Sequence, residues 1–206
     1  MTTSQFRMID ISEKTDTQRT ATASGRIRMA SQTLEMIRQG TSPKGNILAM
    51  AEVAGILATK KTPSLLPLCH PLLINSARVW FEIHQSEVQA FCQVSCSAKT
   101  GVEMEALVGV NIALLTIYDL AKAVDPVIEI TDIHLQEKRG GKSGLWTHPN
   151  YKTPEPTTTE KPRMKGRAVV LTISDRAAQG VYADEAGPLL KSWAESQLTE
   201  PVLLEV

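Results

Sequence analysis

The sequence predicts an α+β fold of the ferredoxin-like, split βαβ type, in which helices cover one face of an antiparallel sheet. Two observations lead to this prediction. The stretch Thr100–Val124 is one long apolar helical segment whose middle carries no charge. The elements around it follow the order strand, helix pair, strand, strand, helix, strand, which is the order of that fold.

The central stretch has apolar residues on every side at helical spacing, which predicts a helix enclosed by its own protein. Glu103 and Glu105 fall in its first turn, where carboxylates suit the helix dipole. Asp119 and Lys122 lie three residues apart near the last turn and so share a face. That face continues back to Glu105 through Leu115, Ile112 and Val108. Charged residues on such a stripe indicate either a buried ion pair or functional side chains.

Composition limits the possible functions. The 206 residues hold one ordinary domain plus a fragment, or two small domains, and 22 basic residues balance 22 acidic ones. No overall field therefore recruits nucleic acid or a membrane, and local basic clusters must bind any anion. Residues 1–17 read as a polar tail without a secretory segment, ordered from near Met8, so we expect a cytoplasmic protein. Cys69, Cys92 and Cys96 lack paired spacing, which argues against a disulfide framework or a structural zinc site and predicts reduced, partly buried thiols.

The elements before the central helix are a strand and two helices. Thr20–Met29 alternates as a strand does. We expect Ser31 to cap a short helix that Gly40 ends, and a second helix over Ile47–Lys60. Lys44 stands at the tip of the turn before that second helix, so it is either an anion ligand near the helix start or a solvated turn lysine.

A loop and a hairpin follow. In the apolar loop Leu65–Leu73, His70 lies between two prolines, so it is either a structural donor or a functional side chain on a stiffened backbone. Ile74–His84 and Glu87–Ser97 are predicted strands joined by a tight hairpin. Cys92 and Cys96 share one face of the second strand and are expected to pack in the core.

The chain after the central helix contains a last strand and a basic loop. Val127–Glu137 is the predicted strand, and Lys138–Gly144 follows with three cations and three glycines. The backbone N–H groups of such a loop can approach an anion closely, although a mobile basic tail has the same composition. The loop lacks the spacing of a Walker P-loop.

The C-terminal quarter has a different composition. Residues 147–165 are rich in Pro, Thr, Lys and Glu and predict an extended linker between a domain at 1–146 and a segment at 166–206. That segment opens as a parallel α/β domain, with a strand over Ala168–Ile173, a helix around Glu185–Gln197 and a strand from Val202. We expect about forty residues to be too few for such a core, as in a truncated fusion, so the segment should be poorly ordered or borrow contacts.

Five motifs occur in a recognisable order. They are KGN at Lys44, PLCHPL around His70, AKTGVEMEAL from Ala98, TIYDLAKAV from Thr116 and KRGGKSG from Lys138. Together they resemble the cyclic pyranopterin monophosphate synthase family of molybdenum cofactor biosynthesis, over Met8 to about Leu145. The resemblance implies a ferredoxin-like subunit in a hexamer built as a trimer of dimers. It also implies a lyase that converts 3′,8-cyclised dihydroguanosine triphosphate into the cyclic pyranopterin phosphate with loss of diphosphate.

The resemblance also implies the site residues. The implied catalytic residues are Asp119, Lys122, Lys44 and Lys138. The implied substrate contacts are Leu68, Cys69, His70, Met104, Glu105 and Arg19, and Lys142 can add positive charge where diphosphate leaves. The sequence departs from the usual family pattern at Asn46, Ala98 and Arg139. No resident cofactor is implied, although the substrate triphosphate can carry Mg²⁺.

One geometric constraint adds to the resemblance. Glu105 and Asp119 would lie about 21 Å apart in one helix, too far to hold the same end of a small substrate. Either Glu105 lies in a loop before the helix, or two subunits share each site. We favour the shared site, which mixing Asp119→Asn chains with Lys44→Ala chains would test.

Other functions remain possible at this point. A non-catalytic pterin- or nucleotide-binding subunit would use the same lysines without turnover. A binder of single-stranded RNA is disfavoured because aromatic residues are only 4% of the chain, and a metal-dependent phosphohydrolase because no His/Asp cluster has ligand spacing. The later stretch LTISDRAAQGVYADEAGP resembles the start of the molybdopterin adenylyltransferase family. That family's nucleotide loop and catalytic acids lie further downstream, so we expect no second activity.

Overall fold

The computed structural model describes residues 6–142, 144–149, 169–171, 188–189, 191–192 and 203–205. The chain divides into two compact units, Met1–Tyr151 and Lys152–Val206, and the first of them contains the sheet and helices that the sequence predicts. Its elements are β1 (Thr17–Arg28), α1 (Ser31–Gln39), α2 (Ile47–Thr59), α3 (Thr62–Leu65), β2 (Ile74–Ile83), β3 (Glu87–Ala98), α4 (Glu103–Ala121), β4 (Glu129–Arg139) and β5 (Trp146–Thr147).

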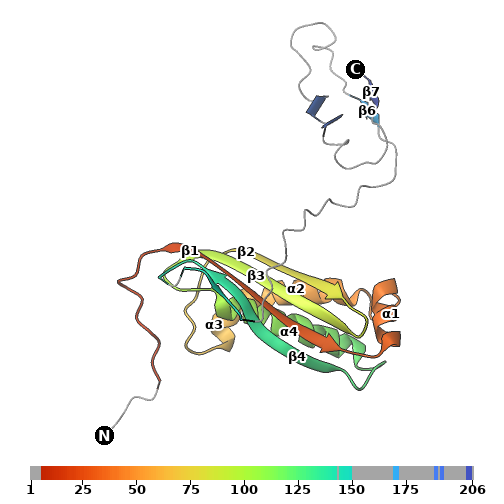
Figure 1. Ribbon diagram of the computed structural model, residues 1–206, viewed down its shortest axis with the longest axis horizontal. Helices are drawn as coiled ribbons and strands as arrows, with labels where there is room; N and C mark the ends of the chain where they lie inside the picture. Colours follow the sequence, from red (N-terminus) through yellow and green to blue (C-terminus); the bar gives the residue numbers. More distant parts are fainter. Residues whose placement is uncertain are drawn as a thin grey trace. The chain divides into compact units, whose positions relative to one another are not determined.

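The sheet of the first unit has the strand order β2-β3-β1-β4-β5, and every neighbouring pair is antiparallel. The helices lie together on one face of this sheet (Figure 1). The predicted α+β fold with split βαβ order is therefore confirmed. The short helix α3 and the short edge strand β5 were not predicted, because four and two residues carry too little periodicity to be recognised.

The core forms where α4 crosses β1. Ala21, Ala23 and Ile27 of β1 are buried at 1%, 0% and 0% exposure, and the side chains on this strand are mostly small. A Cβ atom built on Gly25 would lie 2.7 Å from a side-chain carbon of Leu114, so the helix packs directly on the strand backbone. Substitution of a small residue here would force the two elements apart.

Helix α4 packs against the sheet and against α2 but is left uncovered on its remaining side, so the prediction of a helix buried all round within its own chain is wrong. The residues that face the sheet are fully buried, namely Ala106, Val110, Ala113, Leu114 and Ile117. On the opposite side Leu115 is 54% exposed, and Asp119 and Lys122 are exposed as well. Within the described part of the chain, α4 is long and apolar enough to cross a membrane by length and composition, but 44% of that window is buried. Packing of this kind on a sheet is the arrangement of a core helix.

The start of α1 also differs from the prediction. Ala30, not Ser31, is the N-cap residue, and it has no capping side chain of its own. The carboxylate of Asp125 accepts hydrogen bonds from the Ala30 backbone N–H (2.7 Å) and from the Thr33 hydroxyl (3.1 Å). Asp125, which is 95 positions from Ala30 in the sequence, thus caps the helix in place of the local serine that the sequence predicted. Gly40 ends the helix in the left-handed conformation, as predicted.

The second unit contains a parallel pair of strands, β6 (Val169–Leu171) and β7 (Leu203–Glu205), and residues 188–189 and 191–192 are helical. These positions agree with the strands and the helix expected there. The predicted linker at 147–165 lies outside the described residues except for 147–149, of which Thr147 belongs to β5. The expectation of poor order in this segment likewise concerns residues that are mostly outside the described ones.

Replacing Asp125 by alanine should lower the free energy of unfolding by about 1–3 kcal/mol at pH 7, because the Ala30 N–H and the buried Thr33 hydroxyl lose their acceptor. The Ala30 N–H hydrogen bond lowers the pKa of Asp125. Its stabilisation is therefore fully present above the ordinary aspartate pKa of about 3.9 and disappears as the pH falls through the lower folded-state value. Urea denaturation at pH 7 and at a pH below the folded-state pKa of Asp125 measures this loss of stabilisation. Ser31→Ala is the matched control and should change stability little; an equal loss in both variants would contradict the assignment.

Candidate functional site

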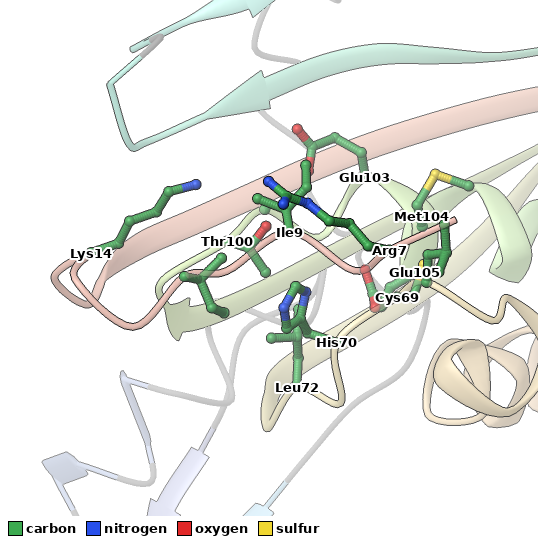
Figure 2. A pocket seen from close by; sticks show the side chains of 13 residues that line it. Arg7, Ile9, Lys14, Cys69, His70, Leu72, Thr100, Glu103, Met104 and Glu105 are labelled. Atoms are coloured by element: carbon green, nitrogen blue, oxygen red, sulfur yellow. The ribbon is translucent and has the colours of Figure 1, made fainter. Parts of the chain in front are cut away.

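A cavity of about 480 Å³ lies at the end of the sheet where α4 begins. It collects the predicted substrate contacts Leu68, Cys69, His70, Met104 and Glu105 in one place. Figure 2 shows Cys69 beside Glu105, with the N-terminal segment that carries Arg7 and Ile9 passing across the cavity. The proline-flanked loop and the start of the central helix thus meet as the sequence motifs suggested, although their roles stay predictions.

The register of the sheet explains why these segments meet. Ile74 pairs with Cys96, so the loop before β2 lies next to the chain that leaves β3 for α4. Thr17 pairs with Ala98, which brings the N-terminal segment to the same end of the sheet. Antiparallel pairing therefore gathers segments that are far apart in the sequence at one end of the sheet.

Glu105 is the buried acid of this cavity, with only 3% of its surface exposed. Burial raises the pKa of its carboxyl group, its own backbone N–H opposes that shift, and the nearby charge of Glu103 adds to it. Burial also raises the pKa of the Cys69 thiol, with a contribution from Glu105. Glu105 is therefore a carboxyl group that keeps its proton to higher pH than an exposed glutamate, as a proton donor in a site requires.

A second cavity of about 980 Å³ adjoins the first, and the two share Lys14, Thr100, Gly101 and Glu103 in their walls. Five cations line the second cavity: Lys14, Arg19, Lys99, Lys138 and Lys142. Three of them, Arg19, Lys138 and Lys142, were predicted. Three carboxylates, Asp10, Glu13 and Glu103, line the same cavity, so cations outnumber acids in its wall by five to three. This excess of positive charge is suited to a phosphate chain.

Lys138 is partly neutralised within its own chain. Its ammonium group lies 2.9 Å from the carboxylate of Glu103, and the two side chains are 34% and 28% exposed. The pair stands at the boundary of the two cavities because Glu103 lines both. Lys138 is thus held where the cation-lined cavity meets the cavity of Glu105.

Three predicted catalytic residues lie at the other end of α4. The Lys122 ammonium is 2.6 Å from an Asp119 carboxylate oxygen, and the Lys44 ammonium donates to the Asp119 backbone carbonyl at 3.1 Å. Hydrogen bonding to Lys122 lowers the pKa of Asp119, and the same contact raises the pKa of Lys122. Both groups are exposed, so mutual attraction outweighs desolvation, a balance that the sequence left open.

The predicted site residues therefore form two groups in one chain. Lys44, Asp119 and Lys122 form one, and the remaining predicted residues line the two cavities. Because α4 begins at Glu103, Glu105 is not in a preceding loop, and about 21 Å of helix separates it from Asp119. The structure thus removes one of the two explanations for that separation.

Sequence reasoning missed several residues that line the cavities. Arg7, Ile9, Ile11 and Lys14 come from the segment that was described only as a tail. No local pattern marks them, because they reach the site through the register of β1. Lys99 and Glu103 lie inside the AKTGVEMEAL motif, so the motif itself was a signal for them.

Among the residues that the structure describes, no three His, Cys, Asp or Glu side chains are close enough to hold a metal ion together. The three cysteines are free, with Cys92 and Cys96 buried and Cys69 partly buried, as predicted. Burial raises the pKa of the Cys92 thiol to about 12.

Comparison with known proteins assigns the first unit. The sequence pattern of the MoaC family matches residues 8–141, which is more than half of the chain. The chain belongs to the MoaC family. A protein of Novosphingobium aromaticivorans named cyclic pyranopterin monophosphate synthase is 51% identical over 140 residues, covering 68% of this chain and 89% of that protein. A protein of the same name from Desulfitobacterium hafniense is 51% identical over 141 residues, covering 67% of this chain and 85% of that protein.

A third relative also matches the C-terminal segment. The molybdenum cofactor biosynthesis bifunctional protein of Synechococcus elongatus is 42% identical over 193 residues, covering 92% of this chain. An alignment of that length must extend beyond Tyr151 into the second unit. The chain spans 60% of the length of that bifunctional protein. The two-part organisation seen in the sequence therefore has a counterpart in a MoaC-family relative.

Replacing Glu105 by glutamine should raise the free energy of unfolding at pH 7 by about 1–3 kcal/mol, because a buried charge is removed. With a raised folded-state pKa, the ionised carboxyl destabilises the fold increasingly as the pH rises above the ordinary glutamate value of about 4.3. Below that value wild type and variant should be equally stable. Denaturation as a function of pH tests the sign.

Glu103→Gln is the matched control for Glu105→Gln, because it makes the same chemical change two residues away. It removes the charge that pairs with Lys138, so it should lower stability at pH 7 by up to about 1 kcal/mol. Shifts of the same sign in the two variants would refute the assignment of Glu105 as a buried acid without an ion-pair partner among the described residues.

Proposed function

We propose that this chain catalyses the cyclic pyranopterin monophosphate synthase reaction of molybdenum cofactor biosynthesis. It converts (8S)-3′,8-cyclo-7,8-dihydroguanosine 5′-triphosphate to cyclic pyranopterin monophosphate and diphosphate by acid–base catalysis. The observation that carries the proposal is the pair of adjoining cavities in a MoaC-family chain, one holding a buried acid and the other lined by cations.

The two cavities match the two parts of this substrate. Arg19, Lys138 and Lys142 take the triphosphate, since charged donors to phosphate oxygens make strong hydrogen bonds. The purine-derived ring system occupies the cavity of His70 and Glu105, whose volume of about 480 Å³ is within the usual range for small-molecule sites. No resident cofactor is part of the proposal, and any Mg²⁺ arrives with the triphosphate.

The chemistry divides between charge stabilisation and proton transfer. Negative charge accumulates on the diphosphate as it leaves, and the cations of the second cavity stabilise it. Glu105 donates a proton, because its pKa is raised by burial. Asp119 is a carboxylate with a lowered pKa in the single chain, so it acts as a base unless its surroundings change on assembly.

Assembly is the second part of the proposal. We infer a homo-oligomer, a hexamer built as a trimer of dimers, in which Asp119, Lys122 and Lys44 of one subunit complete the cavities of another. The separation of about 21 Å along α4 supports this inference, because one small substrate cannot bridge it within a chain. Exposed apolar side chains on the helix layer support it too: Met50, Val53 and Leu57 of α2 and Leu115 of α4 are each more than half exposed.

Incubating the purified protein with the cyclised dihydroguanosine triphosphate should release diphosphate and give the pterin product, both followed by mass spectrometry. Asp119→Asn should lower kcat by about 10²–10⁴-fold, the usual size of an acid–base contribution. Substrate binding without product in the wild type would favour a non-catalytic pterin- or nucleotide-binding subunit instead.

Mixed oligomers test the shared site. When Asp119→Asn and Glu105→Gln chains are unfolded together and reassembled, about a quarter of the sites should be wild type, with an intact cavity from one chain and an intact Asp119 from another. Activity should therefore return. The mixture of Asp119→Asn with Lys44→Ala chains, which the sequence alone offered as the test, is instead the control. Lys44 donates to the Asp119 backbone carbonyl of its own chain, so both changes fall in the same group of residues and this mixture should stay inactive. No recovery in the first mixture would place each site within a single chain.

A further inference from the structure

The turn that follows β4 passes directly over Arg19. Gly140 and Gly141 have φ angles of 98° and 68°, in the left-handed region that glycine adopts readily. A Cβ atom built on Gly140 would overlap the backbone oxygen of Gln18, and one built on Gly141 would overlap the guanidinium group of Arg19. The backbone of the turn and the Arg19 guanidinium group therefore lie so close together that no side chain fits between them.

Hydrogen bonds do not account for the position of this guanidinium group. The Nε atom of Arg19 is buried and has no hydrogen-bond partner among the described residues. Contact with the backbone of Gly141 is what limits the side chain on that side. Arg19 and Gly141 both line the cation-lined cavity, together with Lys138 near the end of β4 and Lys142 in the turn.

We propose that Gly141 is a positioning residue that seats the Arg19 guanidinium in the phosphate-binding cavity. Without a side chain at position 141, the arginine head lies beside the turn and faces the phosphate chain jointly with Lys138 and Lys142. This inference rests on the proposed function and extends it, because it names the residue that orients one of the phosphate ligands.

The three glycines of the turn differ in a way that makes the proposal testable. A side chain at Gly140 meets backbone, so substitution there disturbs the fold itself. A side chain at Gly141 meets the far end of a flexible arginine, which can move while the fold is kept. Gly144 has a φ of 59°, and a Cβ atom built on it would have nothing within 4 Å. Gly144→Ala therefore imposes the same kind of backbone strain as Gly141→Ala without touching Arg19.

The experiment compares Gly141→Ala with Gly144→Ala in the full chain. Inorganic triphosphate is the probe, and its affinity is measured by calorimetry beside KM and kcat for the cyclised dihydroguanosine triphosphate. Gly141→Ala should weaken triphosphate binding and raise KM by about tenfold or more, as expected when a charged hydrogen bond is lost, with a smaller change in kcat. Gly144→Ala should lower Tm by a similar amount and leave the affinity unchanged.

The same comparison in an Arg19→Ala background tests whether Gly141 changes the triphosphate affinity through Arg19. If Gly141 acts through Arg19, Gly141→Ala should cause no further loss of affinity when the guanidinium is already absent. Equal effects of the two glycine variants, or a further loss in the Arg19→Ala background, would overturn the proposal. Wild-type protein that binds triphosphate as described but forms no pterin product would leave the positioning role intact and refute the synthase function instead.

Discussion

The structure depends on the antiparallel pairing of β1 with both β3 and β4. The register of this pairing brings the start of β1, the end of β3 and the end of β4 to the same end of the sheet. Thr17 lies opposite Ala98, and Ala21 lies opposite Lys138. The N-terminal segment, the start of α4 and the glycine-rich basic turn therefore meet there. A shift of one residue would move each of these side chains to the other face of the sheet.

Helix α4 connects the two groups of predicted site residues. Its inner side packs on the small residues of β1, which holds both of its ends in fixed places. Its first turn carries a buried carboxyl group, and its last turns carry an exposed ion pair. The same helix therefore presents one acid whose pKa is raised by burial and another whose pKa is lowered by a lysine. Groups separated in this way suit opposite roles in proton transfer.

The distribution of charge separates the two cavities as well. Glu103 stands between them and pairs with Lys138, so the cations beyond it are set apart from the more apolar space around Cys69 and Leu72. A ligand with a ring at one end and phosphates at the other fits this division, as the proposed substrate does. Arg19, whose Nε has no hydrogen-bond partner among the described residues, lies beside a turn of glycines, so the backbone shapes part of this cavity.

The sequence by itself determined the order of the main strands and helices, and it proposed a set of site residues whose roles stay predictions. Periodicity and glycine positions are local properties, and the motifs around His70, Glu105 and Asp119 are contiguous in the chain. Only the tertiary structure decided that Asp125 caps α1, that Lys14 reaches the cavity, and that one side of α4 stays uncovered by its own chain. Each of these depends on strand register or on contacts between residues far apart in the sequence. Local patterns do not encode such contacts, because they follow from how the packed elements fit together.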